Sequence, residues 1–145
     1  MSHVSKFELQ VTDLDSLDAA CKELGLELVR NQQTYKWYGR SVGDYPVPQG
    51  FTEQDLGKCE HAVRIPDNRT AYEIGVVKSR TGKGYELLWD FYAGGYGMEA
   101  KVGKDGCKLK QQYEVQHGAR FWRRKGYRVT TQTQQDGHIR VKCSR

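Results

Sequence analysis

Alternating hydrophobic and polar residues characterise the first segment of the chain. In SKFELQV, residues 5–11, every second residue from Phe7 onward is hydrophobic and the residues between them are polar. This period of two is typical of a half-buried β-strand. The sequence therefore predicts a strand at the start of the chain.

The next segment, TDLDSLDAACKELG at residues 12–25, has the hydrophobic spacing of a helix. Asp13 is a favourable N-cap residue, and Gly25 is a common helix terminator. The residues expected to form one apolar stripe, spaced three or four apart, are Leu14, Leu17, Cys21 and Leu24.

The middle of the chain changes from strands to a loop and back to strands. LELVR, residues 26–30, begins a second strand, and TYKWYGR, residues 34–40, extends that strand or begins another. Residues 41–58 contain Gly and Pro without a period, which predicts a loop with one short helical turn. An antiparallel meander follows in HAVRIP, TAYEIGVVKSR and GYELLWDFY.

Two sets of residues define the buried face of this meander. We expect Tyr72, Ile74 and Val76 to share one face. The neighbouring strand should place on its buried face Tyr85, Leu87, Trp89 and Phe91, with Glu73, Glu86 and Asp90 pointing the other way.

The C-terminal third predicts one long helix and one hairpin. The helix spans residues 107–125, with an interruption expected near Gly118, and Gly126 ends it. The hairpin pairs YRVTTQT with HIRVKC around the turn pair Asp136-Gly137. Together these elements predict a single α+β domain over residues 1–145, with a mostly antiparallel sheet and two helices packed on one face. The arrangement expected is ferredoxin-like or split βαβ.

The composition agrees with one folded domain outside the membrane. The chain has 145 residues, of which 37% are hydrophobic and 11% aromatic, enough to form a modest core. No apolar run approaches the length of a membrane span, and the first residues lack the basic and apolar regions of a secretory signal. We therefore expect a cytoplasmic protein whose four cysteines, Cys21, Cys59, Cys107 and Cys143, are free thiols.

The net charge of +5 is distributed unevenly along the chain. Residues 101–145 contain 12 Lys and Arg against three acids, whereas residues 1–100 contain 11 against 15. Such an asymmetry concerns the partners of a protein rather than its fold. It directs attention to the C-terminal third.

The segment ARFWRRKGYRV, residues 119–129, combines the two chemistries of nucleic-acid binding. Cations can contact phosphates and aromatic rings can stack on bases. The candidate ligand-binding residues are Arg120, Trp122, Arg123, Arg124, Lys125, Tyr127 and Arg128. A solvated helix end is the alternative, because cations in the last turn complement the negative end of the helix dipole.

The glycine-rich segment YAGGYG, residues 92–97, is a second candidate site for phosphate. Its residues Gly94, Gly95, Tyr96 and Gly97 allow the close backbone approach that an anion-binding loop needs. It matches neither of the established phosphate-loop patterns, so a turn at the end of a strand is the alternative.

The sequence provides no catalytic residues, no metal site and no cofactor motif that we can name. The four histidines lie in unrelated elements, and the short segment from Cys59 to His61 is the single local hint of a metal site. An enzyme would require Asp90, Cys59 and His61 to converge in one pocket.

Four segments resemble one known family. They are the opening residues 1–25, the meander, KLKQQY, and the ending GYRVTTQTQQDGHIRVKC. Together they resemble the chloroplast reading-frame thirty-five-like family, a domain of unknown function in cyanobacteria, plastids and phages. The family implies no reaction and no catalytic residues.

Two functions follow as predictions. The first is a small non-enzymatic protein, in keeping with a phage accessory protein, that binds nucleic acid or a nucleotide through its basic C-terminal third. The second is an adaptor for an AAA-class ATPase, which the resemblance suggests. Its interaction surface would include Tyr45, Val47 and Phe51, or the chain would form a homo-oligomer through a sheet edge.

Overall fold

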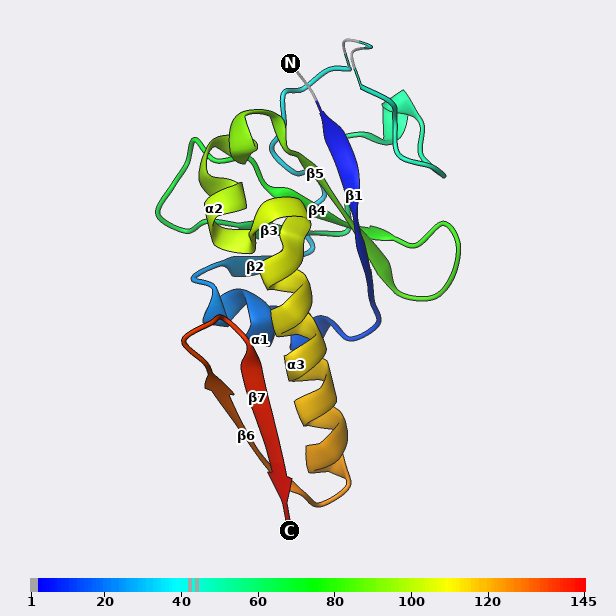
Figure 1. Cartoon of the computed structure of the whole chain (residues 1–145). Coiled ribbons are helices and arrows are strands. Elements are labelled where there is room, and N and C mark those ends of the chain that lie inside the picture. The colour runs from blue at the N-terminus through cyan, green and yellow to red at the C-terminus, as the bar shows by residue number, and fades with distance from the viewer. Residues whose placement is uncertain (1–2, 42, 44) are drawn as a thin grey trace.

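A five-stranded sheet forms the centre of the computed structural model, which describes residues 3–41, 43 and 45–145 (Figure 1). Every pair of neighbouring strands in this sheet is antiparallel. The strands lie in the order β1 (Val4–Val11), β5 (Tyr85–Asp90), β4 (Ile74–Lys78), β3 (His61–Arg64) and β2 (Glu27–Arg30).

The two edge strands are joined by the first helix, α1 (Leu14–Glu23). Because four antiparallel pairings separate them, β1 and β2 run in the same direction with three strands between them. This confirms the α+β class and the mostly antiparallel sheet, and it corresponds to the split βαβ alternative. In a ferredoxin-like sheet the first strand is internal, whereas β1 lies at an edge.

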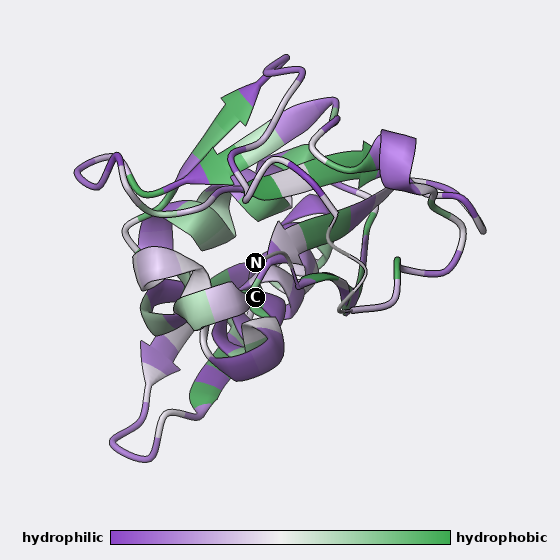
Figure 2. Ribbon diagram, turned by 90° about the horizontal axis from the view of Figure 1, so that it is seen from above, coloured by the Kyte–Doolittle hydropathy of each residue, from purple (hydrophilic) through white to green (hydrophobic). Residues whose placement is uncertain are grey.

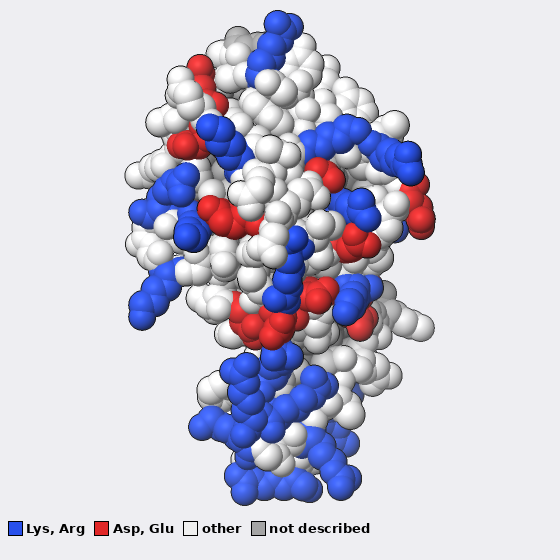
Figure 3. Space-filling model, turned by 180° about the vertical axis from the view of Figure 1, so that it is seen from behind, with Lys and Arg blue, Asp and Glu red and all other residues white. Residues whose placement is uncertain are grey.

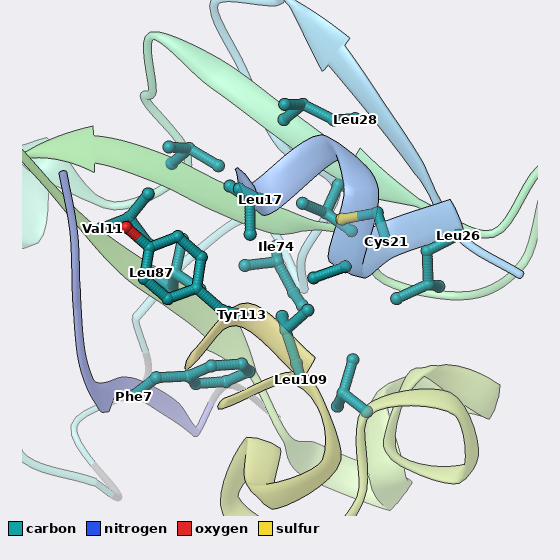
Figure 4. Close-up of a cluster of buried hydrophobic side chains, with 14 of the residues drawn as sticks. Phe7, Val11, Leu17, Cys21, Leu26, Leu28, Ile74, Leu87, Leu109 and Tyr113 are labelled. Atoms are coloured by element: carbon teal, nitrogen blue, oxygen red, sulfur yellow. The ribbon is translucent and has the colours of Figure 1, made fainter. Parts of the chain in front are cut away.

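Helices cover one face of this sheet, as the sequence predicts, but the described chain has three α-helices there and not the two expected. Short α2 (Met98–Val102) and long α3 (Cys107–Arg124) join α1 there, and hydrophobic residues concentrate in the strands beneath them (Figure 2). Side chains from the helices and the sheet meet in one buried cluster (Figure 4). Its fully buried members include Leu17, Cys21, Ile74, Val76, Leu87, Met98, Val102 and Leu109.

The opposite face of the sheet is covered by irregular chain rather than by helices. Tyr35, Phe51 and Leu56 from this segment pack on Ala62 and Leu88 of the sheet. The short helical turn expected in residues 41–58 is present as a 3-10 turn, Glu53–Asp55.

The strand predicted for residues 34–40 is wrong. Its one β-bridge among the described residues joins Thr34 to Lys58. Tyr35 explains the difference. Its side chain is 97% buried, and its ring packs directly on Gly75 of β4, so closely that a Cβ atom at Gly75 would lie 2.3 Å from it. The segment lies across the face of the sheet instead of pairing at its edge. The expected placement of Tyr72 also changes, because β4 begins only at Ile74.

Asp90, at the end of β5, accepts hydrogen bonds from three separate segments of the chain. It points away from the helices, as predicted, but it is fully buried. Its Oδ1 accepts the backbone N–H groups of His3 (3.0 Å) and Tyr92 (3.1 Å), and its Oδ2 accepts that of Tyr38 (3.1 Å). The carboxylate therefore holds the chain before β1, the irregular segment and the chain after β5 together.

The predicted hairpin is present but separate from the large sheet. Strands β6 (Arg128–Thr133) and β7 (Ile139–Ser144) form a two-stranded sheet that packs beside α3 (Figure 1). The interruption expected in α3 is absent, because the helix continues through Gly118. Within the described ranges, no helix is long and apolar enough to cross a membrane.

We predict that Asp90→Asn lowers the free energy of unfolding by about 2–4 kcal/mol, because an amide replaces one acceptor oxygen with a donor facing a backbone N–H group. Urea unfolding monitored by circular dichroism measures the change. Asp67→Asn, at an exposed position, serves as the control and should leave the midpoint unchanged. Equal midpoints for the two variants would contradict the role of Asp90.

Candidate nucleic-acid interface

The C-terminal part of the molecule forms an arm, defined here as residues 118–145. It comprises the last turns of α3 and the β6–β7 hairpin, and it extends away from the large sheet (Figure 1). An 18-residue α-helix is roughly 27 Å long. Leu109 and Tyr113 in its first half are buried in the core, so the second half projects beyond the core.

The base of the arm is fixed to the start of α1. The Tyr113 hydroxyl accepts the backbone N–H groups of Thr12 (2.9 Å) and Asp13 (3.2 Å). Two turns further along α3, Arg120 Nε donates to Asp13 Oδ2 at 3.1 Å. Asp13 also caps α1, where it accepts from Asp15 N and from Ser16 Oγ.

The electrostatics of this joint favour the charged carboxylate. Burial raises the pKa of Asp13, but hydrogen bonds from Ser16 and Asp15 and the charge of Arg120 outweigh it, so the pKa is lowered. Arg120 also lies 3.6 Å from Asp15 Oδ2. The acidic start of α1 therefore neutralises the first cation of the arm.

The hairpin is held to α3 by a few specific contacts. Arg123 Nη2 donates to the carbonyl of Val129 (3.2 Å), the one buried residue of β6. The rings of Trp122 and Tyr127 pack edge to face, with their centroids 5.2 Å apart. A two-stranded hairpin is marginally stable alone, so this packing on α3 positions it.

The arm carries a strong excess of positive charge. Residues 118–145 contain eight Lys and Arg and one acid, Asp136. Figure 3 shows the arm covered by Lys and Arg on the face in view. Within the described part of the chain, carboxylates within ion-pair distance are absent for seven of the eight: Arg123, Arg124, Lys125, Arg128, Arg140, Lys142 and Arg145.

Aromatic rings accompany these cations. The side chains of Phe121 and Trp122 are 51% and 40% exposed. Lys125 Nζ lies 5.1 Å from the centre of the Phe121 ring, and the Arg145 guanidinium lies 4.6 Å from that of Tyr127. Two cations of the arm therefore lie over aromatic rings, one of them exposed Phe121 and the other half-buried Tyr127.

The structure divides the predicted binding residues into two groups. Arg120 and Arg123 have structural partners, in α1 and in β6, and Trp122 and Tyr127 pack on each other. Three predicted cations have no side-chain hydrogen bond or ion pair among the described residues: Arg124, Lys125 and Arg128. The predicted binding residues did not include Arg140, Lys142 and Arg145. Pairing of β7 with β6 brings Arg140 and Lys142 onto the arm, and Arg145, which follows β7, lies over the Tyr127 ring. The basic alternation of IRVKCSR was the available signal.

The glycine-rich segment forms a left-handed turn at the end of β5. Four consecutive residues, from Ala93 to Tyr96, have φ between 52° and 65°. The carbonyls of Gly95 and Tyr96 accept from Tyr72 N and Asn68 Nδ2, so the turn holds the β3–β4 connection. The helix that follows, α2, has only five residues. This geometry agrees with the strand-end turn, the alternative to a phosphate loop.

Cys59, His61 and Asp90 do not form a site. The Cys59 thiol donates to Gln32 O at 3.1 Å, and burial raises its pKa to about 12. His61 Nδ1 accepts from Asn31 N at 2.9 Å, and burial lowers the pKa of this imidazole. No three His, Cys, Asp or Glu side chains of the described residues are grouped to hold a metal. All four cysteines are free, as expected.

Two of the three residues predicted to form an adaptor surface in the long loop, Val47 and Phe51, are not exposed. Phe51 is only 8% exposed, and Val47 packs against the same buried cluster on the second face of the sheet. Tyr45 alone of the three is exposed, at 40%. Phe51 and Val47 therefore pack on the sheet and do not form an exposed surface.

Comparisons with known proteins give no relative for this arrangement. No protein-family model, no curated protein and no solved structure matches the chain. The resemblance to the chloroplast reading-frame thirty-five-like family stays a prediction.

We predict that Ala93→Gly stabilises the protein by about 1 kcal/mol, because a left-handed conformation is costly for alanine and not for glycine. Ala100→Gly, at an exposed position of right-handed α2, is the matched control and should destabilise by up to about 1 kcal/mol. Urea midpoints measure both. A loss of stability in both variants would mean that the turn is not strained.

We predict that Asp13→Ala lowers the free energy of unfolding by about 1 kcal/mol at neutral pH, the usual value of an N-cap. Because the folded pKa is lowered, the contribution of the carboxylate is complete above its ordinary pKa of 3.8 and disappears as pH falls through the folded value. Urea titrations at pH 7 and below pH 3.8 test this. A difference between wild type and variant that grows at acid pH would contradict it.

Proposed function

We propose that this protein is a non-enzymatic module that binds nucleic acid through the arm. The observation that carries the proposal is the position of the cations. Helix-dipole compensation accounts for Arg123, Arg124 and Lys125, which lie at the C-terminal end of α3. It does not account for Arg140 and Lys142, because these residues lie in a β-strand.

A polyanion is the ligand that best fits this charge distribution. Like charges gathered on one projecting element repel one another, and a chain of phosphates removes that repulsion. The cations extend along a hairpin whose two strands have six residues each, a length of about 20 Å. A series of phosphates matches this length better than the compact phosphate group of a free nucleotide.

The exposed rings give the arm a second means of contact. Phe121 is exposed, and an exposed ring can stack on a base. Lys125, whose Nζ lies over this ring, places a cation at the same position. Phosphate contacts would supply most of the affinity and make it strongly dependent on salt.

We predict that Arg124→Glu with Lys125→Glu weakens binding to a labelled 20-nucleotide DNA by at least about tenfold and reduces the magnitude of the salt slope by about two. Fluorescence anisotropy over a series of NaCl concentrations measures both quantities. Arg123 is left unchanged because it holds Val129.

The matched control is Arg69→Glu with Lys83→Glu, which makes the same change of charge at exposed positions outside the arm. It should bind with nearly the wild-type affinity. Equal losses in the two double variants would reject the arm as the binding surface, and the absence of salt-dependent binding in the wild type would reject the function.

A further inference from the structure

The β6–β7 hairpin is a ribbon with two chemically different faces. The register pairs Val129 with Cys143, Thr131 with Val141 and Thr133 with Ile139. These residues share the face that includes buried Val129 and half-buried Ile139. Alternate residues of a strand point to opposite sides, so the remaining pairs form the outward face.

The outward face consists entirely of side chains that can form hydrogen bonds. Its three ladder pairs are Arg128 with Ser144, Thr130 with Lys142 and Gln132 with Arg140. All six residues are exposed, and their side chains make no hydrogen bond or ion pair within the part of the chain that the structure describes. No acid and no hydrophobic residue interrupts this face.

An exposed polar face without internal partners is available to a ligand. Arg pairs with guanine and Gln with adenine in two-bond contacts to base edges, and Thr and Ser accept either base. Three cations and three uncharged hydrogen-bonding groups therefore provide charge and readout on the same surface. Stacking platforms, by contrast, are absent from the outward face, since all of its members are aliphatic or polar.

The dimensions select the form of nucleic acid. Two paired strands lie about 4.8 Å apart, and the major groove of B-form DNA, about 12 Å wide and 8.5 Å deep, admits a two-stranded ribbon. The major groove of A-form RNA is too narrow for side chains to read. Arg124 and Lys125 at the end of α3 lie next in sequence to the ribbon, where they can contact the flanking phosphates.

We propose that the outward face of the β6–β7 ribbon enters the major groove of duplex DNA and reads base edges, principally through Gln132, Arg140 and Thr130. This inference rests on the proposed function, since it names the substrate class of the same arm. It assigns Trp122, which packs on Tyr127 directly before β6, to support of the ribbon, and exposed Phe121 to contacts beside the groove.

The first experiment compares three probes of one sequence by fluorescence anisotropy: a 20-base-pair DNA duplex, its single strand and the corresponding RNA duplex. We expect the DNA duplex to bind at least about fivefold more tightly than either of the other two, the effect of about one base contact. The second experiment selects preferred sequences from a DNA duplex with a randomised centre.

The selection experiment distinguishes contacts to base edges, which depend on sequence, from contacts to phosphates, which depend on charge. Wild type should enrich a short sequence, and Gln132→Ala should lose the preference at one base position without a change in the salt slope. Gln135→Ala, in the exposed turn of the same hairpin, is the matched control and should enrich the wild-type sequence. Circular dichroism melting confirms that both variants fold.

Three results would overturn the inference while leaving the proposed function intact. They are single-stranded DNA or duplex RNA bound as tightly as duplex DNA, no enriched sequence, and an unchanged preference in Gln132→Ala. If the wild type binds none of the three probes in a salt-dependent way, the proposed function fails together with the inference.

Discussion

α3 belongs to two parts of the molecule at once, and the rest of the structure depends on how its first half is fixed. Tyr113 is buried in the core and its hydroxyl accepts two backbone N–H groups from the β1–α1 connection. A helix held rigidly at one end and longer than the core must project at the other. The same hydrogen bonds that complete the fold therefore determine the direction in which the arm extends.

Charge is separated along this helix by the contacts at its base. Asp13 and Asp15 of α1 take up Arg120, which lies nearest to the core. The cations further out have no such acids among the described residues, so the positive potential increases toward the end of the arm. In general, such a concentration of like charge increases the rate of association with ligands of opposite charge.

The two faces of the central sheet are shielded from solvent by different kinds of structure. Helices cover the first face, whereas an irregular segment covers the second and must satisfy its own backbone groups there. The buried Asp90 carboxylate does this for residues from three segments. The left-handed turn directly after it costs conformational free energy, and the packing of Tyr72 and Tyr96 accompanies it. Asp90 therefore stabilises the second face of the sheet, and the contacts of the turn with Asn68 and Tyr72 hold the β3–β4 connection.

The sequence by itself determined the elements whose signals are local: the Asp13 cap, the alternation in the strands, the turn at Asp136-Gly137, and the basic segment at the end of α3. Only the tertiary structure decided which side chains come together. Tyr35 was predicted in a strand and Phe51 on an exposed loop surface, but both rings are buried on the sheet. The free energy gained by burying them outweighs the local preference of the chain for those conformations. Strand pairing places Arg140 and Lys142 on the same basic arm as Arg124 and Lys125. Arg120 is instead paired with Asp13, a residue more than 100 positions away in the sequence. Such contacts depend on long-range geometry, which no local pattern of residues contains.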